Sequence, residues 1–181
     1  MQKEIEIKAK ISSIPEIRKK LKKIGAKKVS SKMEVDIYYT PERGEKYIGK
    51  GSRLKFRIRY DGKSNRGRLE VHKVIGLLEA VEYELPIEDV ELAQKMLKQL
   101  KFIECAVVDK KRESYKFGKL NIVLDKVKSL GKFMEIEIMN ADSKKALTEI
   151  KRFYKKIGIN EKDFHMGEGY GDMMAKLNYK K

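Results

Sequence analysis

Segments in which apolar and fully charged residues alternate with a period of two constrain this chain more than any other feature. The first, Glu4-Ile-Glu-Ile-Lys8, puts Glu4, Glu6 and Lys8 on one face and Ile5 and Ile7 on the other. Such alternation is typical of strands with one apolar and one polar face. It predicts eight strands, at about 3–11, 33–39, 53–60, 68–74, 80–86, 106–116, 119–126 and 132–139.

Helical periodicity fills the segments between several of these strands. Three amphipathic helices are expected at about 14–24, 88–100 and 143–157, and a shorter one at about 170–178. Ser13 and Glu16 form a capping-box pattern at the first helix, and Gly158 follows the third. A chain of 181 residues suits a single domain spanning 1–181. Eight strands with three or four helices predict an α+β fold whose large antiparallel sheet curls or closes.

The charged faces of these strands are segregated by sign. An ordinary solvent-exposed sheet face would explain any single strand. Alternatively the sheet closes and the charges point inward, which requires a wet or ligand-filled interior because each unpaired buried ion costs several kcal/mol. Arginine and lysine suit phosphate oxygens, and clustered carboxylates suit Mg²⁺ or Mn²⁺. The doubled acids are Glu4 and Glu6, Glu82 and Glu84, Glu135 and Glu137; the doubled bases are Arg57 and Arg59, Lys110 and Arg112.

The overall charge favours an anionic partner. There are 43 Lys and Arg residues against 27 Asp and Glu, giving a formal net charge of +16. Nucleic acid, phosphorylated metabolites or an anionic membrane surface would fit, and so would a Lys- and Glu-rich thermophile surface without any such ligand. Lysines between 19 and 28 read as a solvated helix face, so nucleic acid is not the expected partner. Cys105 is the single cysteine, which excludes an internal disulfide and fits a reducing cytoplasm. No membrane-spanning run and no secretory signal are visible.

Taken in order, the charged pairs resemble the CYTH domain, the triphosphate tunnel metalloenzyme family. Glu4–Lys8 matches the ExExK signature that opens this domain. Asp36-Ile-Tyr-Tyr-Thr-Pro41 is similar to the DxYYxxP element of the class IV adenylyl cyclase (CyaB-like) branch. The later matching positions are Arg57 and Arg59 (RxR), Lys73, Glu82 and Glu84, Lys110 and Arg112 (KxR), Asp125, and the LGxFxEIE-like segment from Leu130 to Glu137.

The resemblance implies a closed eight-stranded antiparallel β-barrel, the triphosphate tunnel, with helices packed outside and often a homodimer. It implies a divalent cation, Mg²⁺ or Mn²⁺, held by Glu4, Glu6, Glu135 and Glu137, with Asp125 as a ligand or as the partner of one. Glu82 and Glu84 would be further ligands or would orient the bases. The triphosphate would be gripped by Lys8, Arg57, Arg59, Lys73, Lys110 and Arg112; the residues expected to be catalytic are Glu4, Glu6, Lys8, Arg57, Arg59 and Lys73.

The resemblance also implies a reaction. The first expectation is conversion of ATP to cyclic AMP and pyrophosphate. The alternative is hydrolysis of inorganic triphosphate (tripolyphosphate), thiamine triphosphate or a nucleoside triphosphate, because the same tunnel residues serve both reactions. Charge alone leaves a second alternative, a non-catalytic binder of polyphosphate, nucleotide or RNA.

Several other segments carry narrower expectations. His72 alternates with Lys73 and is expected on the outer face of its strand, and His165 has no assigned role. The segment 44–51 is expected to be a lid over one tunnel mouth or a plain connection. The glycine-rich stretch 167–171 lacks a P-loop ending and is expected to turn before the last helix, with Gly169-Tyr170 where the family often has Ser-Tyr.

Overall fold

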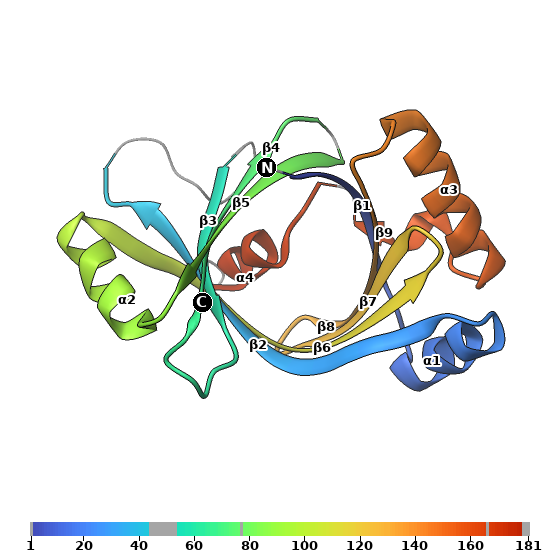
Figure 1. Cartoon of the computed structure of the whole chain (residues 1–181), viewed down its shortest axis with the longest axis horizontal. Helices are drawn as coiled ribbons and strands as arrows, with labels where there is room; N and C mark the ends of the chain where they lie inside the picture. The colour runs from blue at the N-terminus through green and yellow to red at the C-terminus, as the bar shows by residue number, and fades with distance from the viewer. Residues whose placement is uncertain (1, 44–53, 77, 166, 179–181) are drawn as a thin grey trace.

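The computed structural model describes residues 2–43, 54–76, 78–165 and 167–178. The predicted strands and helices are all present, but β9 was not predicted, and the expected lid at 44–51 lies outside the described residues. The elements (Figure 1) are β1 (Gln2–Lys10), α1 (Ile14–Lys23), β2 (Lys27–Pro41), β3 (Leu54–Tyr60), β4 (Gly67–Val74), β5 (Glu79–Ile87), α2 (Val90–Gln99), β6 (Phe102–Phe117), β7 (Leu120–Val127), β8 (Gly131–Met139), α3 (Ser143–Lys156), a 3₁₀ turn (Glu161–Asp163), β9 (Phe164–His165) and α4 (Tyr170–Asn178).

The antiparallel sheet closes on itself. The strand order is β5-β4-β3-β2-β6-β7-β8-β1, and β1 pairs again with β5. Gln2 to Ile5 of β1 face Glu82 to Glu79 of β5, and further along the same edge Lys8 and Ala9 pair with β9. The strands therefore form a ring around a central lumen (Figure 1), which confirms the predicted closed eight-stranded barrel.

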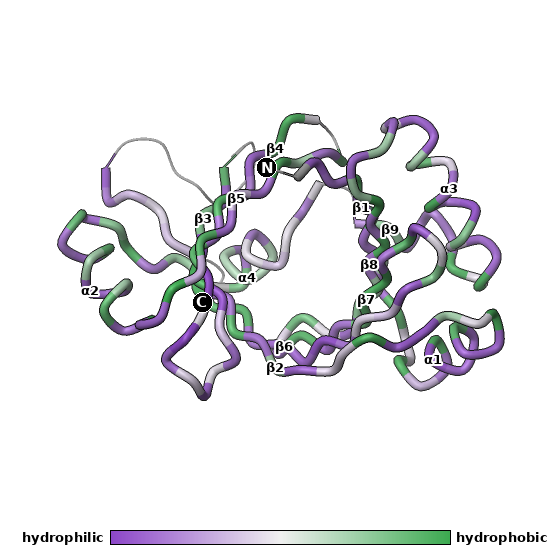
Figure 2. The backbone as a smooth tube through the Cα atoms, in the orientation of Figure 1, coloured by the Kyte–Doolittle hydropathy of each residue, from purple (hydrophilic) through white to green (hydrophobic). Residues whose placement is uncertain are grey.

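The apolar faces of the strands point outward, against helices that cover the ring. Ile5 and Ile7 of β1 and Ile136 of β8 are fully buried beneath α1 and α3. Burying each such side chain contributes roughly 1.5–3 kcal/mol. The Tyr154 hydroxyl of α3 lies 2.7 Å from the Ile7 carbonyl oxygen and so ties the helix to the sheet. Along the strands in Figure 2 the green and purple segments alternate, and because the apolar face is outside, the charged face must line the lumen.

The outer helices begin where the sequence supplies caps. Ser13 Oγ accepts a hydrogen bond from the Glu16 amide at α1, as the capping-box pattern predicted. Asp89 and Asp142 accept equivalent bonds at α2 and α3. Within the described part of the chain, no helix has the length and apolar character that crossing a membrane requires.

Helix α4 differs from the others because it packs on the inner face of the ring. Tyr170 and Met173 cluster with Tyr38 of β2, Val108 of β6 and Phe133 of β8, and α4 lies within the outline of the ring in Figure 1. A Cβ added at position 171 would lie 2.8–2.9 Å from the Tyr38 ring, so only glycine permits this approach. The predicted turn at 167–171 thus leads the chain back into the lumen and leaves the rest of it open.

Candidate active site

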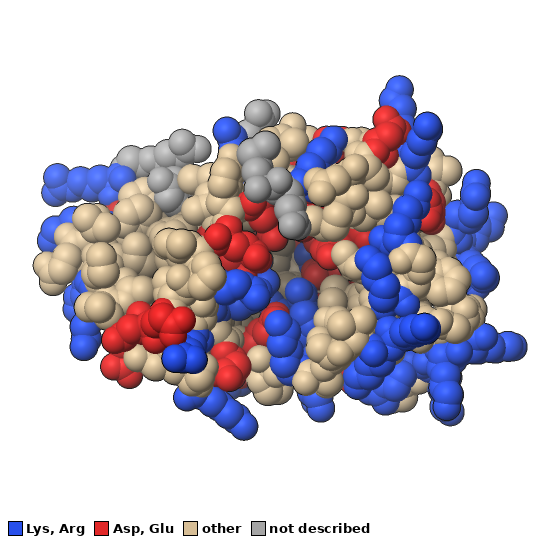
Figure 3. Space-filling view, viewed as in Figure 1, with Lys and Arg blue, Asp and Glu red and all other residues tan. Residues whose placement is uncertain are grey.

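The lumen contains a cavity of about 380 Å³ lined mainly by charged side chains. Figure 3 looks into this hollow and shows acidic and basic side chains meeting around it. The ring brings most of the predicted site residues to this one space, although they come from five different strands. The predicted residues that line the cavity are Glu4, Glu6, Lys8, Arg57, Arg59, Glu82, Glu84, Lys110, Arg112, Glu135 and Glu137.

Arg57, Arg59, Lys110 and Arg112 form what we call the basic wall, and buried carboxylates hold it in place. Asp36 is fully buried and accepts hydrogen bonds from Arg59 at 2.6 and 2.9 Å and from Lys110. Burial alone would raise the pKa of Asp36, but Arg59, Lys110 and Arg57 hold it well below its usual value. Glu70 likewise accepts a 2.6 Å bond from Arg57. Each guanidinium is therefore fixed in position before any ligand arrives.

Arg112 is held in the same way at its end of the wall. It donates to Asp125 at 2.9 and 2.6 Å and to Glu135 at 2.8 Å, and Lys8 lies 3.0 Å from Glu135. Burial would raise the pKa of Glu135, but Lys8 and Arg112 lower it below its usual value. Asp125 is fully buried, accepts a further bond from the Tyr170 hydroxyl at 3.0 Å and does not line the cavity. Asp125 is thus placed as a partner of Arg112.

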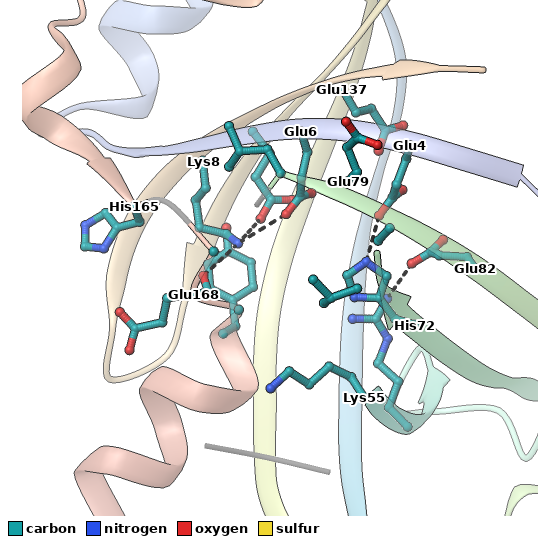
Figure 4. A pocket seen from close by; sticks show the side chains of 18 of the residues that line it. Glu4, Glu6, Lys8, Lys55, His72, Glu79, Glu82, Glu137, His165 and Glu168 are labelled. Atoms are coloured by element: carbon teal, nitrogen blue, oxygen red, sulfur yellow. Dashed lines mark hydrogen bonds and ion pairs between the residues drawn. The ribbon is translucent and has the colours of Figure 1, made fainter. Parts of the chain in front are cut away.

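Glu4, Glu6, Glu82 and Glu137 form a four-carboxylate cluster in the same cavity (Figure 4), and it adjoins the basic wall where Glu82 lies 3.5 Å from Arg57. Burial raises the pKa of Glu137 to about 7, and the nearby charges of Glu4 and Glu6 act in the same direction. The pKa values of Glu6 and Glu82 are also raised, chiefly by burial. Crowded carboxylates whose charged forms are disfavoured are a donor set suited to a hard divalent cation, which takes oxygen ligands.

The structure corrects two predictions on β4. Lys73 is exposed and does not line the cavity, whereas His72 faces the lumen, where its Nε2 lies 3.2 Å from Glu4 Oε1. Leu69 and Val71, which share the face of Lys73, pack against the apolar cluster beneath α2. Alternation shows which residues share a face, and only this apolar packing shows which face is outside. His165, which had no assigned role, also lines the cavity.

The sequence interpretation missed the buried acids of β2 and β4 and the residues of the α4 segment. Glu34 lies 3.4 Å from Lys110 and 3.7 Å from Arg112, and burial, which would raise its pKa, is outweighed so that the pKa falls to about 2. Lys55 of β3 contacts Asp172 of α4 at 2.6 Å. Glu34 forms a doubled acid with Asp36 at spacing two, and Glu70 is an acid between the apolar residues Leu69 and Val71; these are the signals that would have identified them.

The chain is similar to known proteins over most of its length. A family model for the CYTH domain matches residues 2–165. A Methanocaldococcus jannaschii protein named "Putative adenylate cyclase" is 30% identical over 167 residues, covering 87% of this chain and 91% of its own length. The solved PH1012 protein of Pyrococcus horikoshii OT3 superposes with a TM-score of 0.83 at 23% identity, covering 94% of this chain and 99% of its own. HpAC1 from Hippeastrum superposes with a TM-score of 0.65 at 13% identity, covering 98% and 96%.

Proposed function

The chain belongs to the CYTH domain family, and on this premise we propose that it is a divalent-cation-dependent enzyme that binds a triphosphate compound in its lumen and converts ATP to cyclic AMP and pyrophosphate. The observation that carries the proposal is the composition of the cavity, which the basic wall and the four-carboxylate cluster line side by side. A triphosphate bound there would meet the cations of the basic wall, and its counter-cation would meet the carboxylates of the cluster.

The basic wall supplies positioning and charge stabilisation, which are the main protein contributions to phosphoryl transfer. Arg57, Arg59, Lys110 and Arg112, joined by Lys8, would contact the phosphate oxygens. Because buried acids already orient these cations, little reorganisation is needed as charge develops.

The four-carboxylate cluster is the proposed cation site. Glu4, Glu6 and Glu137 are the proposed ligands, whereas Glu135, also predicted as a ligand, is engaged by Lys8 and Arg112 and is proposed to anchor them. When bound, a divalent cation supplies Lewis-acid polarisation of the phosphoryl oxygens.

Cyclisation then requires only an in-line displacement. The ribose 3′-oxygen forms a bond to the α-phosphorus, and the bond from that phosphorus to the oxygen bridging to the β-phosphorus breaks. The hydroxyl proton passes to a carboxylate of the cluster, and pyrophosphate leaves. The basic wall would hold the two phosphates that depart.

Triphosphate hydrolysis is the second candidate, and the contacts of the Asp36–Pro41 element favour keeping it. Asp36 binds Arg59, and the Tyr38 hydroxyl accepts a 3.0 Å bond from Arg57. The element that pointed to a cyclase thus supports the basic wall, which both reactions need. HpAC1, described as having a dominant triphosphatase activity, shares the fold, so the fold is compatible with attack of water on the terminal phosphorus.

A substrate panel tests these two reactions. The protein is incubated with ATP, tripolyphosphate or thiamine triphosphate, each with Mg²⁺ or Mn²⁺, and cyclic AMP, pyrophosphate and orthophosphate are measured. Equal amounts of cyclic AMP and pyrophosphate from ATP support the cyclase, and orthophosphate supports the hydrolase. Absence of turnover with every compound contradicts both. Strongly salt-dependent binding that survives Glu4→Gln and Glu6→Gln would then indicate the non-catalytic binder.

Two substitutions on neighbouring strands should distinguish a residue that lines the lumen from one on the outer face. Arg57→Gln is expected to lower kcat/KM at least about 100-fold, because it removes a preorganised cation facing the phosphates. Glu70 keeps Arg68 at 3.0 Å and Arg59 at 3.4 Å, so the fold should survive. Lys73→Gln, the matched control, should stay within about twofold because Lys73 is exposed outside the cavity. Equal losses in the two variants would contradict the placement of the site.

Other expectations from the sequence stay predictions. They are a cytoplasmic location, a homodimer, the absence of nucleic-acid and membrane partners, and the choice between Mg²⁺ and Mn²⁺.

A further inference from the structure

Closure of the ring brings one histidine beside two glutamates from different strands. Glu82 of β5 pairs directly with His72 of β4, and on its other side it pairs with residue 2 of β1. Glu4 is the next inward-facing residue of β1. The three side chains therefore converge from three adjacent strands, as Figure 4 shows, although the β1–β5 contact joins strands far apart in the sequence.

The distances suit ligands of one ion. One potential ligand atom from each of Glu4, His72 and Glu82 lies within 4.8 Å of the other two. Atoms bound to one cation at about 2.1 Å lie at most about 4.2 Å apart, so side-chain adjustments of under an ångström would close the set. Glu82 also lies 3.5 Å from Arg57, so the cluster adjoins the proposed phosphate-binding wall.

The imidazole nitrogen that faces this cluster lies close to Glu4 without forming a hydrogen bond. His72 Nε2 is buried, and among the described residues it has no hydrogen-bond partner, even though Glu4 Oε1 is 3.2 Å away. An unsatisfied buried polar atom costs about 1–3 kcal/mol. A cation that accepts a nitrogen ligand would satisfy all three groups at once.

We propose that Glu4, His72 and Glu82 bind a divalent transition-metal cation, which makes this lumen favour Co²⁺, Zn²⁺ or Mn²⁺ over Mg²⁺. The inference rests on the proposed function: this position shares Glu4 with the proposed ligand set of Glu4, Glu6 and Glu137, and His72 and Glu82 are the ligands that select a transition metal there. Mg²⁺ binds oxygen ligands and gives up its water reluctantly, whereas imidazole suits transition metals. A site of carboxylates alone would not make this distinction.

Pulsed electron paramagnetic resonance of Mn²⁺ added to the full metal-free chain tests this without substrate. A directly bound imidazole nitrogen modulates the Mn²⁺ echo decay. The chain has two histidines, so two single variants assign the signal. Nitrogen modulation is expected in the wild type and in His165→Gln and is expected to disappear in His72→Gln.

Calorimetric titration provides the second measurement. His72→Gln should weaken Co²⁺ binding at least about tenfold and leave Mg²⁺ binding within about twofold. Mn²⁺ that binds the wild type without nitrogen modulation would overturn the proposal, and so would modulation that persists in His72→Gln. The wild-type spectrum decides the first point even if the variant fails to fold. Because these measurements omit substrate, a negative result here leaves turnover of the panel compounds with Mg²⁺ as a separate test of the proposed function.

Discussion

Glu137→Gln is expected to raise the free energy of unfolding of the metal-free protein at pH 8 by about 3 kcal/mol. Burial and the charges of Glu4 and Glu6 raise the pKa of Glu137 from 4.5 to about 7. The folded state therefore binds this proton more tightly than the unfolded state. Below about pH 4.5 both states hold the proton, whereas between about pH 4.5 and 7 only the folded state does. Stability therefore falls across that window by about 1.4 kcal/mol per pH unit, and the loss is complete above about pH 7. Glutamine keeps the shape without the charge, and its carbonyl can still accept from Asn121, 2.9 Å from Glu137 Oε1.

Denaturant unfolding at several pH values measures this effect. The difference between wild type and Glu137→Gln should be near zero at about pH 4 and should grow to its full size by about pH 8. Glu161→Gln is the matched control, because Glu161 is 68% exposed in its ion pair with Lys151. It should change stability by under about 1 kcal/mol at every pH. A constant difference between wild type and Glu137→Gln across this range would contradict the proposed burial of charge.

The same substitution should be costly for function. If Glu137 is a cation ligand, Glu137→Gln should weaken divalent-cation affinity about 10–100-fold and lower turnover accordingly. Saturating cation should stabilise the wild type, by about 2.7 kcal/mol at 100 times Kd, and should stabilise the variant less. Glu137 would then destabilise the metal-free fold and strengthen cation binding, which is a trade-off between stability and activity.

The sequence was sufficient to predict the elements and the composition of most of the lumen. Period-two alternation within β1, β3 and β8 depends only on neighbouring residues, and it correctly grouped Glu4 with Glu6, Arg57 with Arg59 and Glu135 with Glu137. The helix caps could be predicted for the same reason, because a cap depends only on residues near the end of the helix. The order of the charged pairs indicated the family resemblance, and that resemblance predicted the closed ring. Periodicity alone did not require the sheet to close.

Features that depend on contacts between distant strands could not be predicted in this way. Inward-facing His72 and outward-facing Lys73 differ by one position, and the packing of Leu69 and Val71 beneath α2 decides between them. The two-residue strand β9 is too short to show a period. Glu70 stands alone among apolar residues, so its pairing with Arg57 appears only when β3 and β4 are placed side by side.

Removing Asp36 is expected to be the most destabilising conservative change in the lumen. Asp36→Asn leaves Arg59 and Lys110 buried without the carboxylate that both contact. Breaking a buried ion pair by removing one partner costs about 3–5 kcal/mol. Denaturant unfolding at neutral pH measures the loss. Glu88→Gln is the control, because Glu88 and Arg66 are each 78% exposed and such a pair contributes at most about 1 kcal/mol.

The pH dependence of this loss identifies its cause. Burial and the charge of Arg59 lower the pKa of Lys110 to about 8, even with Asp36 present. Without Asp36 the pKa falls further, and the lysine sheds its proton near neutral pH, so the penalty should shrink as the pH rises from about 6 to about 9. Tripolyphosphate should raise the melting temperature of Asp36→Asn more than that of the wild type, because it supplies the missing negative charge. A loss that is independent of pH, or equal shifts with tripolyphosphate, would show that Asp36 does not hold the basic wall for an anion.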